Sequence, residues 1–102
     1  MAKIVALYKK PADAAAFDTY YFSTHVPKAK GLTGLRSYEV STGPVATPAG
    51  DSPYHLVALL GFDSLAAIQS VMGSPQGQAV AADLANFAQA GVDLLVFDTK
   101  EA

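Results

Sequence analysis

The sequence contains no cysteine, which excludes disulfide bonds, thiolate metal sites and a cysteine nucleophile. Charged residues are also scarce, because they make up 16% of the chain, against about 25% in an average soluble domain. Apolar residues account for 51%, so there is too little charge to coat the whole surface of the folded chain. We therefore expect part of its apolar surface to lie against another protein chain.

Basic residues and long apolar runs are lacking too. The seven lysines and arginines come together only at Lys9-Lys10 and at Lys28 and Lys30, which is not the basic patch of a nucleic-acid-binding protein or of a membrane anchor. The apolar run 4–7 is too short for a signal peptide, and no run approaches the ~20 residues of a membrane helix. We expect a cytoplasmic protein with no nucleic acid or membrane partner. A chain of 102 residues has the usual size of one domain, and we predict a single domain over residues 1–102.

Four segments are predicted to be β-strands. Residues 2–8 and 54–60 are apolar runs typical of strands that are buried on both faces. Residues 92–97 form the last strand, and residues 35–41 alternate weakly, as in a more exposed strand. Residues 42–53 are rich in proline, glycine and serine and are predicted to form a loop.

The first helix is predicted from its end signals. Asp13 is an N-cap residue for a helix over residues 14–24. Pro27 is expected to end this helix, because the residue before a proline disfavours the helical conformation. A turn follows at residues 31–34, which begin and end with glycine.

A second helical region lies between the last two strands. Asp63 or Ser64 is predicted to cap a short helix that Gly73 closes. Ser74-Pro75 then starts another helix, with the serine as N-cap and the proline at the first helical position, and Gly91 ends it. Its apolar stripe consists of Val80, Leu84 and Phe87.

The predicted order of elements is β-α-β-β-α-β, the ferredoxin-like arrangement. It is an α+β fold in which a four-stranded antiparallel sheet carries both helical regions on one face. Strands 2–8, 54–60 and 92–97 nevertheless carry apolar residues on both faces. One helical layer covers only one face, and a second copy of the same sheet is the simplest cover for the other. We therefore predict a homodimer formed through the sheet face that points away from the helices.

The first half of the chain carries a distinctive pattern. A strand ending in Leu-Tyr-x-x-Pro is followed by Ala-Phe-Asp-x-Tyr-Tyr, by His-x-Pro, and by Gly-Leu before the next strand. The residues at these positions are Leu7, Tyr8, Pro11, Ala16, Phe17, Asp18, Tyr20, Tyr21, His25, Pro27, Gly34 and Leu35. With this pattern, and with YHLVALLGFDS followed by a Ser-Pro helix start, the sequence resembles the EthD-like family of dimeric α+β barrels over nearly its whole length.

This resemblance implies a fold and leaves the reaction open. The EthD family takes its name from a protein encoded with an ether-degrading oxygenase system, in which its role is auxiliary and chemically undefined. The wider barrel group includes cofactor-independent monooxygenases, muconolactone isomerase, polyketide cyclases, haem-binding members and ligand-binding domains. The resemblance therefore implies a dimeric α+β barrel more firmly than any one activity.

His25 is the first candidate for chemistry. It follows Phe17 by eight residues and Tyr21 by four, so the three side chains are predicted on one helix face. Histidine changes its protonation state near neutral pH and can act as a general base, and His25 matches the family's His-x-Pro motif. We predict a neutral His25 in a pocket wall, with Tyr21 orienting an oxygen atom of the ligand. The alternative is a histidine that binds the last carbonyl groups of its helix.

The other candidates form a predicted ligand-binding set. A tyrosine buries its ring and keeps a polar tip, so several tyrosines can line an aromatic pocket, although ordinary packing is the alternative for most of them. His55 is predicted to share a strand face with Val57 and Leu59, and its place near a strand end indicates a rim position. The predicted ligand-binding residues are Phe17, Tyr20, Tyr8, His55 and Tyr38.

No motif for a metal or an organic cofactor is present. Two histidines without any cysteine do not supply a zinc site, and the chain has no glycine-rich phosphate loop, no paired-carboxylate motif and no His-x-x-x-His spacing. We expect neither a metal nor a cofactor. A haem ligated by His25 remains the open alternative.

Two kinds of function are compatible with these residues. The first is a small cofactor-independent enzyme or accessory protein that acts on a small apolar, oxygenated molecule by monooxygenation, proton transfer or cyclisation. In that case His25 moves a proton, and the resemblance to the EthD-like family implies that the process served is ether degradation or similar chemistry. The second is a non-catalytic module that binds a small molecule for a partner enzyme. An enzyme needs His25 within hydrogen-bond reach of the ligand, whereas a carrier needs only an apolar pocket.

Overall fold

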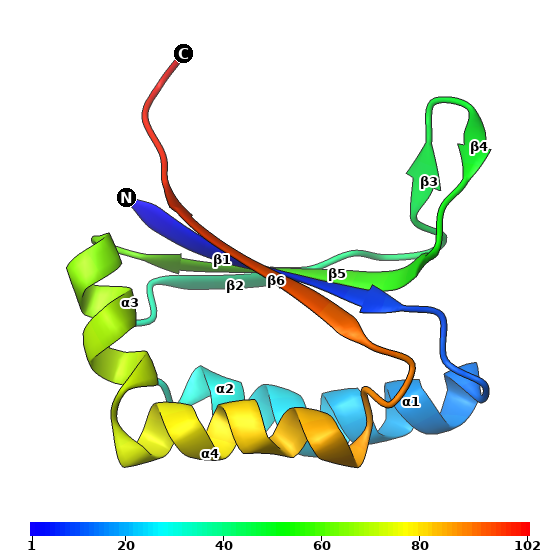
Figure 1. Cartoon of the computed structure of the whole chain (residues 1–102), viewed down its shortest axis with the longest axis horizontal. Helices are drawn as coiled ribbons and strands as arrows, with labels where there is room; N and C mark the ends of the chain where they lie inside the picture. The colour runs from blue at the N-terminus through cyan, green and yellow to red at the C-terminus, as the bar shows by residue number, and fades with distance from the viewer.

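A four-stranded antiparallel sheet in the order β2-β5-β1-β6 forms one layer of the structure (Figure 1). The computed structural model describes all residues from 1 to 102. The sheet strands are β1 (Ala2–Lys9), β2 (Ser37–Val40), β5 (Tyr54–Phe62) and β6 (Val92–Asp98). The segment predicted as a loop contains a two-stranded hairpin of β3 (Ala46–Thr47) and β4 (Gly50–Asp51), which projects away from the helices.

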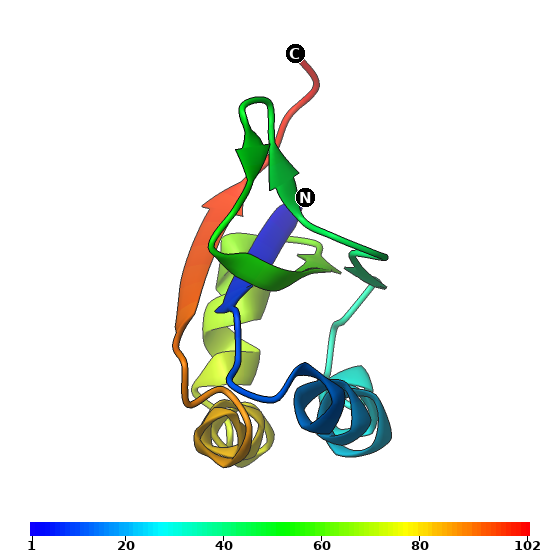
Figure 2. The same ribbon diagram turned by 90° about the vertical axis from the view of Figure 1, so that its right-hand side faces the viewer.

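The helices form a second layer on one face of the sheet, and Figure 2 shows the chain end-on with two helical rods side by side below the strands. The helical segments are α1 (Ala14–Tyr20), a π-helical turn (Tyr21–His25), α2 (Val26–Lys30), α3 (Leu65–Met72), α4 (Pro75–Asp83) and a 3₁₀ turn (Leu84–Asn86). This confirms the predicted α+β, ferredoxin-like fold. No helix of the chain is both long enough and apolar enough to span a bilayer.

Predicted caps begin three of the helices. The side chain of Asp13 accepts a hydrogen bond from the backbone N–H of Ala16 at the start of α1. Ser64, rather than Asp63, caps α3, and Ser74 caps α4 with Pro75 at the first position. These side chains satisfy N–H groups that have no partner inside the helix.

The helix predicted to end at Pro27 continues through it to Lys30, so this prediction was wrong. A proline cannot donate a backbone hydrogen bond, and its ring clashes with the carbonyl group four residues earlier in a regular α-helix. The π-helical turn immediately before Pro27 removes this conflict, because its wider loop pairs the N–H of Val26 with the carbonyl of Tyr21. The first helical rod therefore passes through the proline without ending.

The sheet face toward the helices forms the core. Alternate residues of the two central strands point into it and are at most 7% exposed. They are Ala2, Ile4, Ala6 and Tyr8 of β1 and Leu56, Ala58, Leu60 and Phe62 of β5. Burying these rows against the helical layer is the main source of stability of the fold, because apolar burial contributes roughly 25 cal/mol per Å².

The opposite sheet face is apolar as well, and no other part of the chain covers it (Figure 1). Val5 lies between Leu59 and Leu95 in the register of the sheet. Leu59 is 38%, Leu95 50% and Phe97 41% exposed. Apolar residues on both sheet faces were the basis of the predicted homodimer. The apolar residues of the face away from the helices are present and open to solvent in the single chain.

A β-bulge near the start of β5 changes the direction of His55. Tyr8 of β1 pairs with Leu56, but the next residue, Lys9, pairs with Tyr54, so His55 is an extra residue in its strand. Bulges of this kind re-aim side chains. The prediction that His55 shares a face with Val57 and Leu59 was therefore wrong, because its ring points toward α1 instead.

Candidate functional site

A cavity of about 60 Å³ lies between the sheet and the helical layer. Side chains from all four strands of the sheet and from the helical layer line it, and twelve of the thirteen lining residues are hydrophobic. The polar groups in the wall are the imidazole of His25 and the hydroxyl groups of Tyr8 and Tyr38. Leu94 of edge strand β6 also lines the cavity and is 50% exposed, so the cavity reaches the surface beside β6. A volume of this size is several times the ~10–15 Å³ that one water needs and suits a small molecule.

The side chain of His25 is held by an aspartate from the second helical rod. Nδ1 of His25 lies 2.9 Å from Oδ2 of Asp83, the last residue of α4. His25 is 4% and Asp83 2% exposed. A buried imidazole and a buried carboxylate thus form a dyad on the helical side of the cavity.

The second oxygen of Asp83 receives three further hydrogen bonds. Tyr20 donates to Oδ1 at 2.6 Å, Asn86 at 3.0 Å and Lys28 at 3.4 Å. Burial on its own would raise the pKa of this carboxyl group, but the hydrogen bonds from Tyr20, Asn86, His25 and Lys28 outweigh burial and hold the pKa well below its usual range. Asp83 is therefore ionised at neutral pH.

The state of His25 follows from this environment. Burial is the largest influence and lowers the pKa of the imidazole from its ordinary value of 6.5, although the hydrogen bond and charge of Asp83 act to raise it. His25 is therefore neutral at pH 7. An ionised carboxylate can only accept hydrogen bonds, so the proton of the ring lies on Nδ1 and is donated to Asp83. This leaves a lone pair on Nε2.

Nε2 of His25 is free to meet a ligand. It has no hydrogen-bond partner within the chain. It is not sealed from solvent either, because no fully buried side-chain nitrogen or oxygen lacks a partner. A neutral imidazole fixed at one nitrogen and open at the other is the arrangement of a general base.

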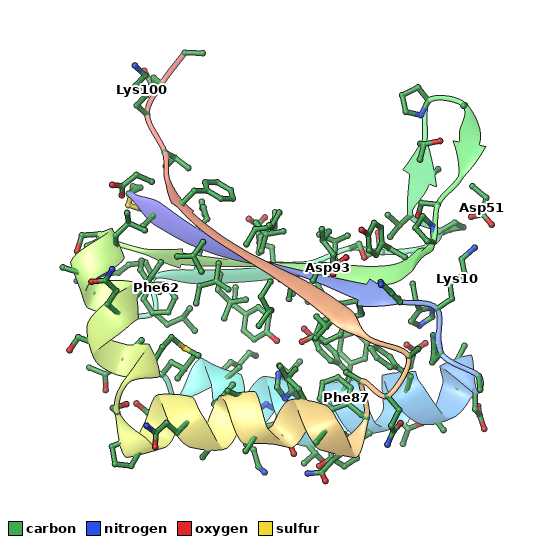
Figure 3. All side chains as sticks on the ribbon, viewed as in Figure 1. Lys10, Asp51, Phe62, Phe87, Asp93 and Lys100 are labelled. Carbon is green, nitrogen blue, oxygen red and sulfur yellow. The ribbon has the colours of Figure 1, made fainter.

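The π-helical turn sets the position of His25. Turns of this kind occur often at functional sites, and here His25 is the last residue of the turn and Tyr21 the first. The wide turn keeps residues four apart close together on one face, and the two rings lie 5.5 Å apart. Phe87, labelled in Figure 3, packs against His25, with its ring centroid 4.7 Å from that of the imidazole.

A pair of hydroxyl groups connects this turn to the sheet. The hydroxyl oxygen of Tyr21 lies 2.7 Å from that of Tyr38 on β2. Tyr38 lines the cavity, whereas Tyr21 is fully buried behind it. Tyr8 is 2% exposed, and burial, followed by the charges of Tyr38 and Asp83, raises the pKa of its hydroxyl. The tyrosines of the site therefore remain protonated and can donate hydrogen bonds to a ligand oxygen.

The other predicted ligand-binding residues lie outside the cavity wall. Tyr20 faces Asp83, and Phe17 is 4% exposed within a cluster of aromatic rings. His55 packs edge-on against Phe17 at 5.1 Å between ring centroids, and its Nε2 lies 2.7 Å from Oδ1 of Asp18. His55 borders an open groove on the other side of α1 instead.

Sequence reasoning missed Asp83. The signal was its spacing, because Asp83 follows Val80 by three residues and precedes Phe87 by four, which places an acidic residue on the apolar stripe of its helix. An acidic side chain on such a stripe is buried and needs a partner. That partner is His25.

The described residues do not provide a metal site or room for a haem. No group of three or more histidine, aspartate or glutamate side chains is placed to hold a metal ion. His25 uses Nδ1 for Asp83, and the cavity of about 60 Å³ is far smaller than the ~300–1,000 Å³ typical of pockets for larger ligands. A haem ligated by His25 does not fit this cavity.

Comparisons with known proteins agree with this fold. The model of the EthD domain matches residues 9–91. An uncharacterized 11.0 kDa protein from the thcB-thcC intergenic region of Rhodococcus erythropolis is 37% identical over 99 residues, which are 96% of this chain and 94% of that protein.

Two solved structures are similar as well. An ethyl tert-butyl ether D (EthD) family protein from Bacillus halodurans is 33% identical, with a TM-score of 0.89 over 98% of this chain and 99% of that one. SnoaB, a cofactor-independent oxygenase from Streptomyces nogalater, is 14% identical, with a TM-score of 0.68 over 99% of this chain and 94% of that one, and shares the fold alone. On the family model and the two relatives above 30% identity, the chain belongs to the EthD family.

Proposed function

We propose that the protein is a small cofactor-independent enzyme that moves a proton on a small, apolar, oxygenated molecule held in the cavity. The observation that carries this proposal is the dyad of His25 and Asp83, with Nδ1 bound to the carboxylate and Nε2 left open. A histidine with a purely structural role needs only neighbouring groups that fill space and satisfy its hydrogen bonds. A buried carboxylate with four hydrogen-bond donors is a costly support for such a role.

The proposed step uses three groups of the chain. Nε2 of His25 accepts a proton from an O–H or an activated C–H bond of the ligand. The imidazolium that forms is stabilised by the Asp83 carboxylate, and the negative charge left on the ligand oxygen is stabilised by a hydrogen bond from Tyr8 or Tyr38. Tyr21 supports Tyr38 from behind through its hydroxyl group. Return of the proton to another atom of the ligand completes an isomerisation or cyclisation.

The same step also prepares oxidoreductase chemistry. An enolate or phenolate formed by His25 is electron-rich and can react with dioxygen, which is the co-reactant in that case. Similarity of fold to a cofactor-independent oxygenase supports this extension. We propose an enzyme or accessory role of this kind, in ether degradation or a related pathway.

The proposal further concerns one domain over residues 1–102 that acts as a cytoplasmic homodimer. Support for the dimer comes from the apolar sheet face that the chain leaves uncovered, on which Leu59, Leu95 and Phe97 are 38%, 50% and 41% exposed. A second copy placed face to face on this sheet leaves both cavities on the outer, helical sides of the pair.

Hydrogen–deuterium exchange on a simple carbon acid tests the catalytic proposal. Cyclohexanone is a neutral ketone of one ring, and the exchange of its α-hydrogens in D₂O is followed by proton NMR. The wild-type protein should accelerate exchange over buffer, and His25→Asn should lose about 10²-fold of this rate, the usual contribution of a general base. His55→Asn is the matched control, because it removes the chain's other histidine, which lies outside the cavity. Equal exchange by wild type and His25→Asn contradicts the proposal.

A non-catalytic binding module is the second candidate. The observation in its favour is the wall itself, of which twelve of thirteen residues are hydrophobic. In that case cyclohexanone shifts the amide resonances of wall residues such as Leu84 and Leu94, while the exchange rate of its α-hydrogens stays that of buffer in every variant.

A further inference from the structure

Asp83 places one full negative charge inside the helical layer, where its side chain has no exposed surface. A charge in such a place has to be balanced by a positive charge nearby. Two of its hydrogen-bond donors, Tyr20 and Asn86, are neutral and cannot provide this balance. The remaining two, His25 and Lys28, can.

His25 and Lys28 therefore compete for the same role. If His25 supplied the positive charge, it would be an imidazolium with a proton on both nitrogens, and Nε2 would have no lone pair. Lys28 follows His25 by three residues, so α2 places its side chain on the same side of the helical rod. Its Nζ reaches Oδ1 of Asp83 at 3.4 Å, and its side chain is 48% exposed, so its aliphatic part spans from solvent to the buried carboxylate.

We propose that Lys28 is a positioning residue of the dyad, whose ammonium group balances the negative charge of Asp83. His25 therefore does not need to carry the balancing positive charge and stays a neutral base. This inference rests on the proposed function in one respect only, which is the use of the neutral His25 as a base. The arrangement divides the carboxylate between two partners. Oδ1 faces the lysine and Oδ2 orients the imidazole.

The other groups packed around His25 carry no charge. Tyr21 of its own turn, Tyr38 of β2 and Tyr8 of β1 all have a hydroxyl pKa that burial raises. Burial is the largest influence on the pKa of His25, and Asp83 and Lys28 are the charges that act on it in addition. The charge of Lys28 lowers the pKa of His25 and that of Asp83 raises it, in agreement with the proposed division.

NMR titration of His25 tests this inference without a substrate. In Lys28→Met the carboxylate loses its cation, so the pKa of His25 should rise, because an unbalanced opposite charge nearby favours the imidazolium. Lys28→Arg should restore the wild-type value. Lys30→Met is the matched control, because Lys30 is exposed on the same helix and has no hydrogen bond to Asp83.

A second variant tests the direction in which the pKa of His25 shifts. Asp83→Asn removes the negative charge, and the pKa of His25 should then fall rather than rise. An unchanged pKa of His25 in Lys28→Met, or a fall in both variants, overturns the inference, and Lys28→Gln replaces the methionine variant if that one does not fold. A shifted pKa combined with no exchange of cyclohexanone in the wild type would instead contradict the proposed function and leave the role of Lys28 standing.

Discussion

The hydroxyl oxygens of Tyr21 and Tyr38 lie 2.7 Å apart, although the first residue begins the π-helical turn and the second lies on edge strand β2. Their hydrogen bond ties the helical layer to the sheet at one side of the cavity. Burial is the largest reason why the pKa of both hydroxyl groups is raised. The pair is therefore uncharged at neutral pH and acts as a structural link between the two layers rather than as an acid.

Removing one hydroxyl of this pair should be more harmful than removing both. Tyr38→Phe leaves the hydroxyl of the fully buried Tyr21 without a partner, which should lower the free energy of unfolding by about 1–3 kcal/mol. Adding Tyr21→Phe should recover part of this loss. Urea unfolding measures both. Tyr54→Phe is the control, since the hydroxyl of Tyr54 donates to Asp93 on the exposed surface, and an equal loss in Tyr38→Phe and Tyr54→Phe contradicts the prediction.

Stability should fall in acid through Asp83 and His25. The pKa of Asp83 is lowered in the folded chain, so its contribution is fully present above the unfolded value of about 3.9 and is lost as the pH falls below it. The pKa of His25 is also lowered, so the unfolded chain binds its proton first and stability declines below about pH 6.5.

Urea unfolding at pH 7 and pH 3 checks this dependence. Asp83→Asn should be less stable than wild type at pH 7, by about 1.5–3 kcal/mol for a lost charged hydrogen-bond partner. The gap between Asp83→Asn and wild type should narrow at pH 3. A gap that is the same at both pH values would show that the pKa of Asp83 is not lowered in the folded chain.

Pro27→Ala should release the π-helical turn. An alanine has an N–H group and no ring, so a regular α-helical turn becomes possible at this point. We expect His25 to rotate away from Asp83, and the Nδ1–H resonance, protected by the hydrogen bond in wild type, to broaden through exchange with water. Pro75→Ala is the matched control, because Pro75 lies in the first turn of α4, where its missing N–H needs no partner. A sharp Nδ1–H resonance in Pro27→Ala refutes the causal role of the proline.

Charge on the open sheet face should prevent dimer formation. Leu95→Lys places an ammonium group in the middle of the proposed interface, and sedimentation should show a monomer where wild type is a dimer. Phe22→Lys is the control, since Phe22 is 49% exposed, as apolar and as open as Leu95, but lies on the helical side. A wild-type chain that sediments as a monomer at micromolar concentration removes the basis of the dimer proposal.

The sheet was predictable because its signals are local. The apolar run 2–8 became β1 with one residue added, and Ser64 and Ser74 cap helices as their side chains indicate. The path of the chain through Pro27 was not predictable. A proline usually ends a helix, and the wide hydrogen bond from the N–H of Val26 to the carbonyl of Tyr21, which carries the helical rod past it, leaves no signal in the sequence.

The candidate site was predictable in part for a similar reason. His25 follows from its helical spacing, but the direction of His55 depends on a single extra residue in β5, which becomes visible only when the register with β1 is known. Asp83 is joined to His25 across two helical rods, and nothing local in either segment shows that the two side chains meet.

The central strand β1 precedes both of its sheet neighbours in the sequence, and these are β5 and β6, which begin at Tyr54 and Val92. Residues 2–9 therefore have no strand partner until β5 has been synthesised, and the second side of β1 stays open until β6 has left the ribosome. Pairing between segments far apart in the sequence is slow, because a long loop must close before the contacts form. During synthesis the helical segments can form first, while β1 remains an apolar, unpaired strand, which is the kind of segment that is prone to aggregation.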